Sequence, residues 1–144
     1  NIKYPTDWRY YEKNGPETFS PDRIFQVSFL SPSNKVLSDM VFVWFNIEKI
    51  KDSVSLDDRK NILLKNLNNS SIDVKVQSTK LSGIDAFMID YTNKAIELQR
   101  NIGIEAIRDG LLYSLDFTAR PDTFEKNLDS IETMIKSMNI SSFT

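Results

Sequence analysis

The feature that most constrains the fold is the dipeptide Asp109-Gly110, which lies between two segments of alternating apolar and polar residues. This is the strongest short signal for a β-hairpin, because both central residues of a type I′ turn need positive φ. With a two-residue turn, the cross-strand apolar pairs are Ala106 with Tyr113, Ile104 with Leu115 and Ile102 with Phe117. The sequence therefore predicts two antiparallel strands with these side chains on one face.

A second turn is predicted upstream, centred on Asn93-Lys94. It pairs Ile89 with Leu98 and Tyr91 with Ile96, which extends the apolar face to a third strand, interrupted only by Arg100. Because side chains alternate along a strand, a slip of one residue would exchange the two faces.

The opposite face of the three strands is predicted to be polar and acidic. Its candidate ligand-binding residues are Asp90, Glu97, Glu105 and Asp116. The predicted register sets Asp90 across from Glu97, and like charges in that position are destabilising. A bound cation, a Lys or Arg from another element, or a β-bulge would relieve the repulsion. A wet outer face is the other interpretation, since antiparallel sheets commonly leave one side solvated.

An amphipathic helix is predicted after the last strand. Pro121 ends that strand, and Asp122 with Glu125 three residues later forms a capping-box pattern. The apolar side chains that recur at helical spacing are Phe124, Leu128, Ile131, Ile135 and Met138. We expect this stripe to pack on the sheet face that carries Ile89, Leu98, Ile104 and Leu115.

The first half of the chain predicts further strands and one more helix. Short strands are expected at Ile2-Lys3-Tyr4, Trp8 to Tyr11, Phe25 to Phe29 and Val74 to Leu81, and residues Met40 to Ile47 are apolar on both sides. Ser55 is the predicted cap of a helix that runs to Leu67. The order of elements predicts a single α+β domain over residues 1–144, with a mainly antiparallel sheet and helices packed against it.

Composition excludes several kinds of chemistry. The chain has no His and no Cys, so Cys/His zinc sites, Ser-His-Asp or Cys-His catalysis and disulfides are ruled out. Any metal would be a hard cation such as Ca²⁺ or Mn²⁺ held by carboxylates. No phosphate-binding glycine motif occurs, and we expect a protein that is not an enzyme and has no cofactor.

Charge and targeting signals bear on partners. The formal net charge is −2 with dispersed Lys and Arg, which does not support nucleic-acid binding. A chain that starts at Asn1 is compatible with a removed signal or anchor, through which any membrane attachment would run. Three asparagines, Asn68, Asn69 and Asn139, begin N-glycosylation sequons. The sequons are compatible with export, and we expect a monomer.

An ordered set of short segments resembles the PsbP-like family. The segments span nearly the whole chain and are Asn1 to Trp8, Phe29 to Pro32, Leu81 to Ala86, Asp90 to Thr92, Asp109-Gly110, Tyr113, Phe117 to Ala119 and Met134 to Met138. The pattern is most similar to the stand-alone PsbP-like domains of archaea and bacteria.

The resemblance implies an antiparallel sheet sandwiched between helices. It also implies a non-enzymatic accessory protein outside the cytoplasm, secreted or anchored at the cell surface, with a protein or cell-surface partner. No residue of a shared functional motif is identifiable, so the resemblance carries over no site. Two hypotheses follow: an accessory module that binds a protein or surface layer, and a divalent-cation or small-ligand binder that uses the acidic sheet face.

Overall fold

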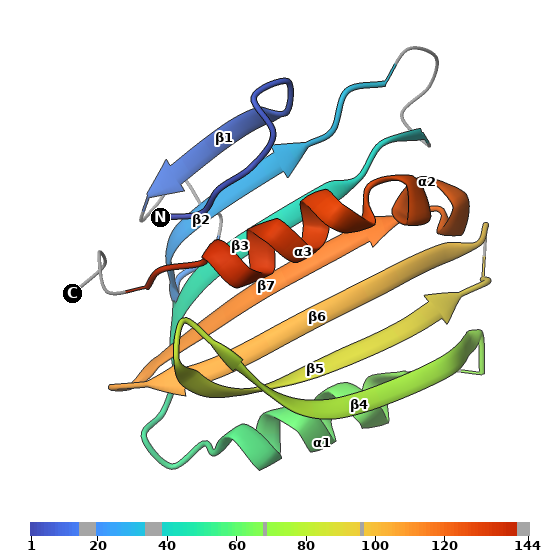
Figure 1. Ribbon diagram of the computed structural model, residues 1–144. Coiled ribbons are helices and arrows are strands. Elements are labelled where there is room, and N and C mark those ends of the chain that lie inside the picture. Colours follow the sequence, from blue (N-terminus) through green and yellow to red (C-terminus); the bar gives the residue numbers. More distant parts are fainter. Residues whose placement is uncertain (15–19, 34–38, 68, 96, 141–144) are drawn as a thin grey trace.

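The computed structural model describes residues 1–14, 20–33, 39–67, 69–95 and 97–140 and contains one sheet and three helices within them (Figure 1). In chain order the elements are β1 (Arg9–Asn14), β2 (Arg23–Leu30), β3 (Phe42–Lys49), α1 (Leu56–Asn66), β4 (Ser71–Leu81), β5 (Ile84–Asn93), β6 (Gln99–Arg108), β7 (Leu111–Ala119), α2 (Pro121–Lys126) and α3 (Leu128–Ser137). The predicted α+β class with a mainly antiparallel sheet is confirmed.

The sheet has seven strands in the order β1-β2-β3-β7-β6-β5-β4, and neighbouring strands pair antiparallel. Two meanders, β1 to β3 and β4 to β7, meet where β3 pairs with β7. The chain crosses from β3 to the far edge of the sheet through α1, which therefore lies against one face. The helices after β7 lie against the other face, so the sheet is sandwiched between helices (Figure 1).

The β6–β7 hairpin is confirmed residue by residue. Ala106 pairs with Tyr113, Ile104 with Leu115 and Ile102 with Phe117. The turn residues Asp109 and Gly110 have φ of 54° and 73°, as a type I′ turn requires. Local turn chemistry alone therefore determines the register of two strands that contribute to the core.

The predicted β5–β6 register is wrong. Asn93 pairs with Gln99, so the connection spans residues 94–98, and Ile89 lies opposite Gly103 rather than Leu98. The shift is an odd number of residues, which turns β5 over relative to β6. Phe87, Ile89 and Tyr91 consequently share a face with Glu105, while Leu98 is exposed. Ile96 lies outside the described residues.

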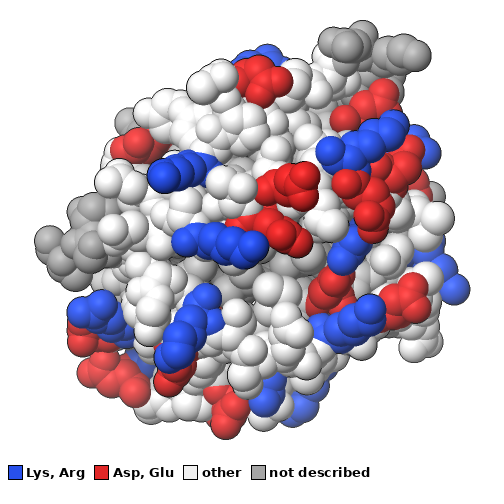
Figure 2. Space-filling model, viewed as in Figure 1, with Lys and Arg blue, Asp and Glu red and all other residues white. Residues whose placement is uncertain are grey.

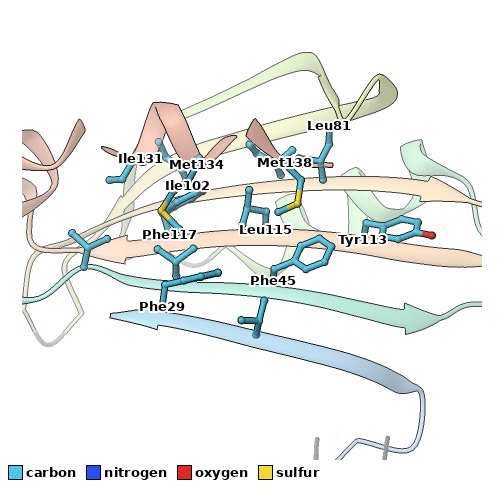
Figure 3. Packing of buried hydrophobic residues seen from close by; sticks show 14 of the residues in the cluster. Phe29, Phe45, Leu81, Ile102, Tyr113, Leu115, Phe117, Ile131, Met134 and Met138 are labelled. Carbon is cyan, nitrogen blue, oxygen red and sulfur yellow. The ribbon is translucent and has the colours of Figure 1, made fainter. Parts of the chain in front are cut away.

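The main core lies between the sheet and α3 (Figure 3). Ile131 and Met134 of α3 are 1% and 0% exposed. The strand side chains of this core that Figure 3 labels are Phe29, Phe45, Leu81, Ile102, Tyr113, Leu115 and Phe117. The predicted stripe thus packs on the Ile104 and Leu115 face, and its placement over Ile89 and Leu98 is wrong because β5 is turned over.

The C-terminal helix is broken at Asn127 into α2 and α3. Asn127 has φ −111° and ψ 11°, and its side-chain Nδ2 donates to the carbonyl of Thr123. The helix starts two residues earlier than predicted, with Pro121 in the first turn and Arg120 as N-cap, so the Asp122 cap is wrong. Proline is favoured at this first helical position because the missing N–H needs no partner there.

The remaining elements mostly follow the prediction. Ser55 caps α1, as expected, while Ile2-Lys3-Tyr4 is not a strand. In β3, Val43, Phe45 and Ile47 on one face are buried, and Phe42 and Trp44 on the other are half-buried, their ring centroids 5.8 Å apart and stacked.

The surface seen in Figure 2 carries interspersed positive and negative side chains and no continuous stripe of one sign. Among the described residues, no helix has the length and hydrophobicity needed to cross a bilayer.

Changing Ile131 to Asp should abolish folding. The substitution places an unpaired charge in a site that is 1% exposed, at a cost of more than about 3 kcal/mol. Circular dichroism and thermal melting measure the outcome, with the exposed neighbour change Glu132→Gln as control. A soluble Ile131→Asp variant with the parent's melting midpoint would contradict this packing.

Candidate functional site

The face of the sheet covered by α1, here called the α1 face, is polar at its centre. Alternate residues of three adjacent strands point there: from β3 Trp44, Asn46 and Glu48, from β7 Ser114, Asp116 and Thr118, and from β6 Asn101, Gly103 and Glu105. The same strands send Phe45, Leu115 and Ile104 into the core on the opposite face. One alternating pattern therefore builds an apolar core and a polar layer back to back.

An ion pair joins α1 to this layer. Arg59 donates from Nε and Nη2 to the two carboxylate oxygens of Glu105, at 2.9 and 2.8 Å. Glu105 is only 6% exposed, and the hydrogen bonds from Arg59 to its carboxylate raise the pKa of the guanidinium. Two-point pairing of this kind is among the stronger charge-assisted contacts.

The sequence at the start of α1 places Arg59. The hydroxyl of Ser55 accepts from the backbone N–H of Asp58 at 3.0 Å, and the Asp58 carboxylate accepts from the Ser55 N–H at 2.9 Å. This capping box fixes the first helical turn. Arg59 follows directly, so the cap sets which helical position reaches Glu105.

Asp116 is the unusual residue of the α1 face. Only a minor part of it reaches solvent, and no described residue donates a hydrogen bond to its carboxylate. Burial raises the pKa of Asp116 to about 7, and the nearby carboxylates Glu105 and Glu48 add to the effect, while Arg23 and Arg59 oppose it. Water or a ligand is the usual partner of such a group.

Gly103 makes room for that carboxylate. It is the cross-strand neighbour of Asp116, and a Cβ at position 103 would lie 3.0 Å from Asp116 Oδ1. With a Cβ at this position, the carboxyl group would have to shift by a few tenths of an ångström. Glycine here serves close approach across the ladder rather than a turn.

A pocket of about 190 Å³ lies between α1 and the sheet beside Asp116. Its lining includes Leu63 and Leu67 from the helical side and Ile89, Tyr91 and Asn101 from the strands. Asn101 is held in place, since its Oδ1 accepts from Thr118 Oγ1 at 2.8 Å and its Nδ2 donates to the carbonyl of Gln99 at 3.2 Å. Burial, with a smaller contribution from Asp116, raises the pKa of the Tyr91 hydroxyl, so the phenol stays protonated.

The structure brings together two of the four predicted site residues. Glu105 and Asp116 share the α1 face, but Asp90 lies on the opposite face and pairs across the ladder with Ile102, not Glu97. Glu97 is exposed in the connection between β5 and β6. The predicted four-carboxylate face is wrong for the same reason as the β5–β6 register: the 94–98 connection turns β5 over.

Asp90 has a structural partner instead. Arg100 Nη2 lies 2.9 Å from Asp90 Oδ2, and the guanidinium also lies 4.7 Å above the ring of Phe124. Hydrogen bonds to Asp90 raise the pKa of Arg100. The guanidinium of Arg100, which interrupts the apolar face, is thus neutralised by Asp90. Asp90 is attracted by Arg100 and is not repelled by Glu97, as the predicted register implied.

The candidate glycosylation sites are only partly described. Asn69 and Asn139 are exposed, and Asn139 donates its backbone N–H to the carbonyl of Asn1 at 2.7 Å. Asn68 lies outside the described residues. Glycosylation at these positions stays a prediction.

Sequence reasoning missed two residues that line the pocket and the arginine that pairs with Glu105. Tyr91 was assigned to the apolar face, Arg59 was not assigned to any site, and Gly103 was not singled out. The signal available was the hairpin register, which already set Gly103 beside Asp116. Among the residues that the structure describes, no group of three or more carboxylates is placed to hold a metal ion.

The comparisons with known proteins bear on the fold. No protein-family model matches the sequence, and a search of curated proteins finds no match. Solved structures do match over most of the chain. The solution structure of cyanobacterial PsbP (CyanoP) from Synechocystis sp. PCC 6803 is 13% identical, with a TM-score of 0.63, and the match covers 94% of this chain and 83% of that one.

Two further structures are similar to the same extent. LpqN, involved in cell envelope biogenesis of Mycobacterium tuberculosis, is 14% identical with a TM-score of 0.64, over 96% of this chain and 81% of its own. A protein of unknown function from Pseudomonas aeruginosa, PA94, a putative regulator by its description, is 10% identical with a TM-score of 0.63, over 92% and 83%. The chain therefore has a PsbP-like fold.

Replacing Asp116 with Asn should stabilise the protein in a pH-dependent way. The raised pKa means that the folded chain binds this proton more tightly than the unfolded chain, so the stability it contributes is present below pH 3.8 and is lost as the pH rises to about 7. The gain from Asp116→Asn should grow over that range and level off at roughly 4 kcal/mol above pH 7.

Denaturant unfolding of parent and variant from pH 4 to pH 8 measures this difference. Asp90→Asn is the matched control, because it removes one carboxylate partner of Arg100, the other being Glu125, and should destabilise the protein at pH 7. A gain for Asp116→Asn that does not change with pH would show that the carboxyl is not buried as described.

Proposed function

We propose that this chain is a non-enzymatic accessory module that acts outside the cytoplasm and binds another protein or a cell-surface component. The PsbP-like fold supports the proposal, since one protein with this fold, LpqN, takes part in cell envelope biogenesis. The lack of His and Cys supports a binding role over catalysis. Fold similarity alone is a weak basis for function, so the proposal depends on a surface feature of this chain.

The observation that carries the proposal is an aromatic groove beside the edge strand. No helix overlies β1 and β2 in Figure 1, and a groove of about 460 Å³ is lined by side chains of both strands, among them Tyr10 of β1 and Phe29 of β2. Tyr4 and Tyr10 are 36% and 51% exposed, and the Tyr4 ring lies 4.7 Å from that of Phe29. Aromatic side chains held together in this way are enriched at protein interfaces.

The edge position of β1 adds a second means of contact. Among the described strands, β1 pairs only with β2, so the outer edge of β1 offers backbone donors and acceptors to a partner strand. Addition of a strand at such an edge supplies affinity through the backbone, while side-chain pockets supply specificity. A partner that offers an extended segment fits the groove and the edge together.

Changing Tyr10 to Ser should reduce partner capture at least tenfold without unfolding the chain, because it removes an exposed ring from the groove. Crosslinking on native cells, followed by affinity capture and mass spectrometry, compares the parent, Tyr10→Ser and the control Ile62→Ser. Ile62 is 45% exposed on α1 and does not line the groove. Equal loss in both variants, or a cytoplasmic location of the full-length protein, would contradict the proposal.

A second candidate function is small-ligand binding in the pocket on the α1 face. It is favoured by one specific observation, the unpartnered and largely buried carboxyl group of Asp116. Of the hypotheses drawn from the sequence, this is the one that uses Glu105 and Asp116.

A further inference from the structure

The pocket on the α1 face has apolar walls and one acidic end. Leu63, Leu67 and Ile89 supply hydrocarbon surface, and Asp116 supplies the carboxylate. Sites that bind small molecules commonly combine apolar lining with a few placed polar groups. At about 190 Å³ the pocket has room for a small organic molecule.

The charges around the pocket do not balance. Arg59 and Glu105 neutralise each other through two hydrogen bonds, and Arg23 and Glu48 form another ion pair at 2.6 Å. Asp116 is left with no hydrogen-bond partner among the described residues. The arrangement therefore carries one excess negative charge when Asp116 is ionised, which one monovalent cation would balance.

We propose that this pocket binds a small organic ammonium ion, with Asp116 as its counter-ion. The proposal rests on the second candidate function and names its ligand class. The ammonium group lies against the Asp116 carboxylate, and the hydrocarbon part of the ligand lies against Leu63 and Leu67 of the helical side. Tyr91 also lines the pocket, and aromatic side chains attract cations.

Other ligand classes fit the pocket less well. Ca²⁺ takes six to eight oxygen ligands, whereas both oxygens of Glu105 are engaged by Arg59 and the described residues hold no cluster of three metal-binding groups. A carboxylate or phosphate ligand would meet the negative charge of Asp116. An uncharged ligand would leave Asp116 without a counter-ion.

Three probes of nearly the same shape test the ligand class: cyclohexylammonium, cyclohexanol and cyclohexanecarboxylate. Each is titrated at pH 8 into the intact chain labelled with ¹⁵N, and amide shifts and calorimetric heats are recorded. We expect saturable shifts at Tyr91, Gly103 and Asp116 with the ammonium probe, at least tenfold weaker binding of the alcohol, and no binding of the carboxylate. Because the pKa of Asp116 is about 7, the ammonium affinity should fall about tenfold between pH 8 and pH 6.

Variants locate the binding. Asp116→Asn, which should fold at least as stably as the parent, should lose at least tenfold in ammonium affinity and also lose the pH dependence. The matched control is Asp90→Asn, which removes a carboxylate of the opposite face and should leave the affinity unchanged. Gly103→Ala should weaken binding, since a Cβ at this position would displace the Asp116 carboxyl.

The outcomes distinguish a failure of the ammonium proposal from a failure of small-ligand binding in this pocket. Equal binding of alcohol and ammonium, or saturable Mn²⁺ binding at Asp116, would overturn the ammonium proposal while small-ligand binding stands. No shift in the pocket with any of the three probes would overturn both. Ammonium binding that persists in Asp116→Asn would overturn the role of Asp116 as counter-ion.

Discussion

Strand β7 has partners on both sides, β3 and β6, and every other part of the molecule is arranged around that double pairing. Its side chains alternate between Leu115 and Phe117 on one face and Ser114 and Asp116 on the other. The first pair belongs to the core under α3. Burial of the apolar surface of that core supplies most of the favourable free energy of folding. Because side chains alternate along the strand, Ser114 and Asp116 then point to the opposite face, where polar groups must find partners. The polar α1 face is therefore a consequence of the core.

The two turns of the closing meander show what sequence can and cannot determine. Asp109 and Gly110 adopt positive φ, a local property that two residues encode by themselves. The 94–98 connection has no such code, so a two-residue turn at Asn93-Lys94 was as consistent with the apolar pattern as the longer one. Its register depends on what β5 packs against, including the pairing of Asp90 with Arg100, and such long-range contacts cannot be seen in a local pattern.

The prediction of the candidate site is likewise right for the β6–β7 hairpin and wrong for β5. Glu105 and Asp116 were placed on one face correctly because both belong to the hairpin that the Asp-Gly turn fixes. Tyr91 and Asp90 each lie on the face opposite to the one predicted, because both belong to β5, which is turned over. Arg59 comes from a helix whose orientation over the sheet follows from the crossover between β3 and β4, so no spacing in the sequence relates it to Glu105. The alternating pattern of the strands locates the carboxylates Glu105 and Asp116, but it does not locate Arg59, the partner of Glu105.

The two helical layers are held by different means, and this has a consequence for motion. α3 is anchored by fully buried Ile131 and Met134, whereas α1 has no buried residue and is joined to the sheet by the Arg59–Glu105 pair and partly buried leucines. Segments with few buried apolar contacts open with lower free energy than the rest of a fold. We therefore expect amide hydrogens of α1 to exchange before those of β6 and β7. Local opening of α1 would admit small molecules to the α1 face while the sheet stays intact.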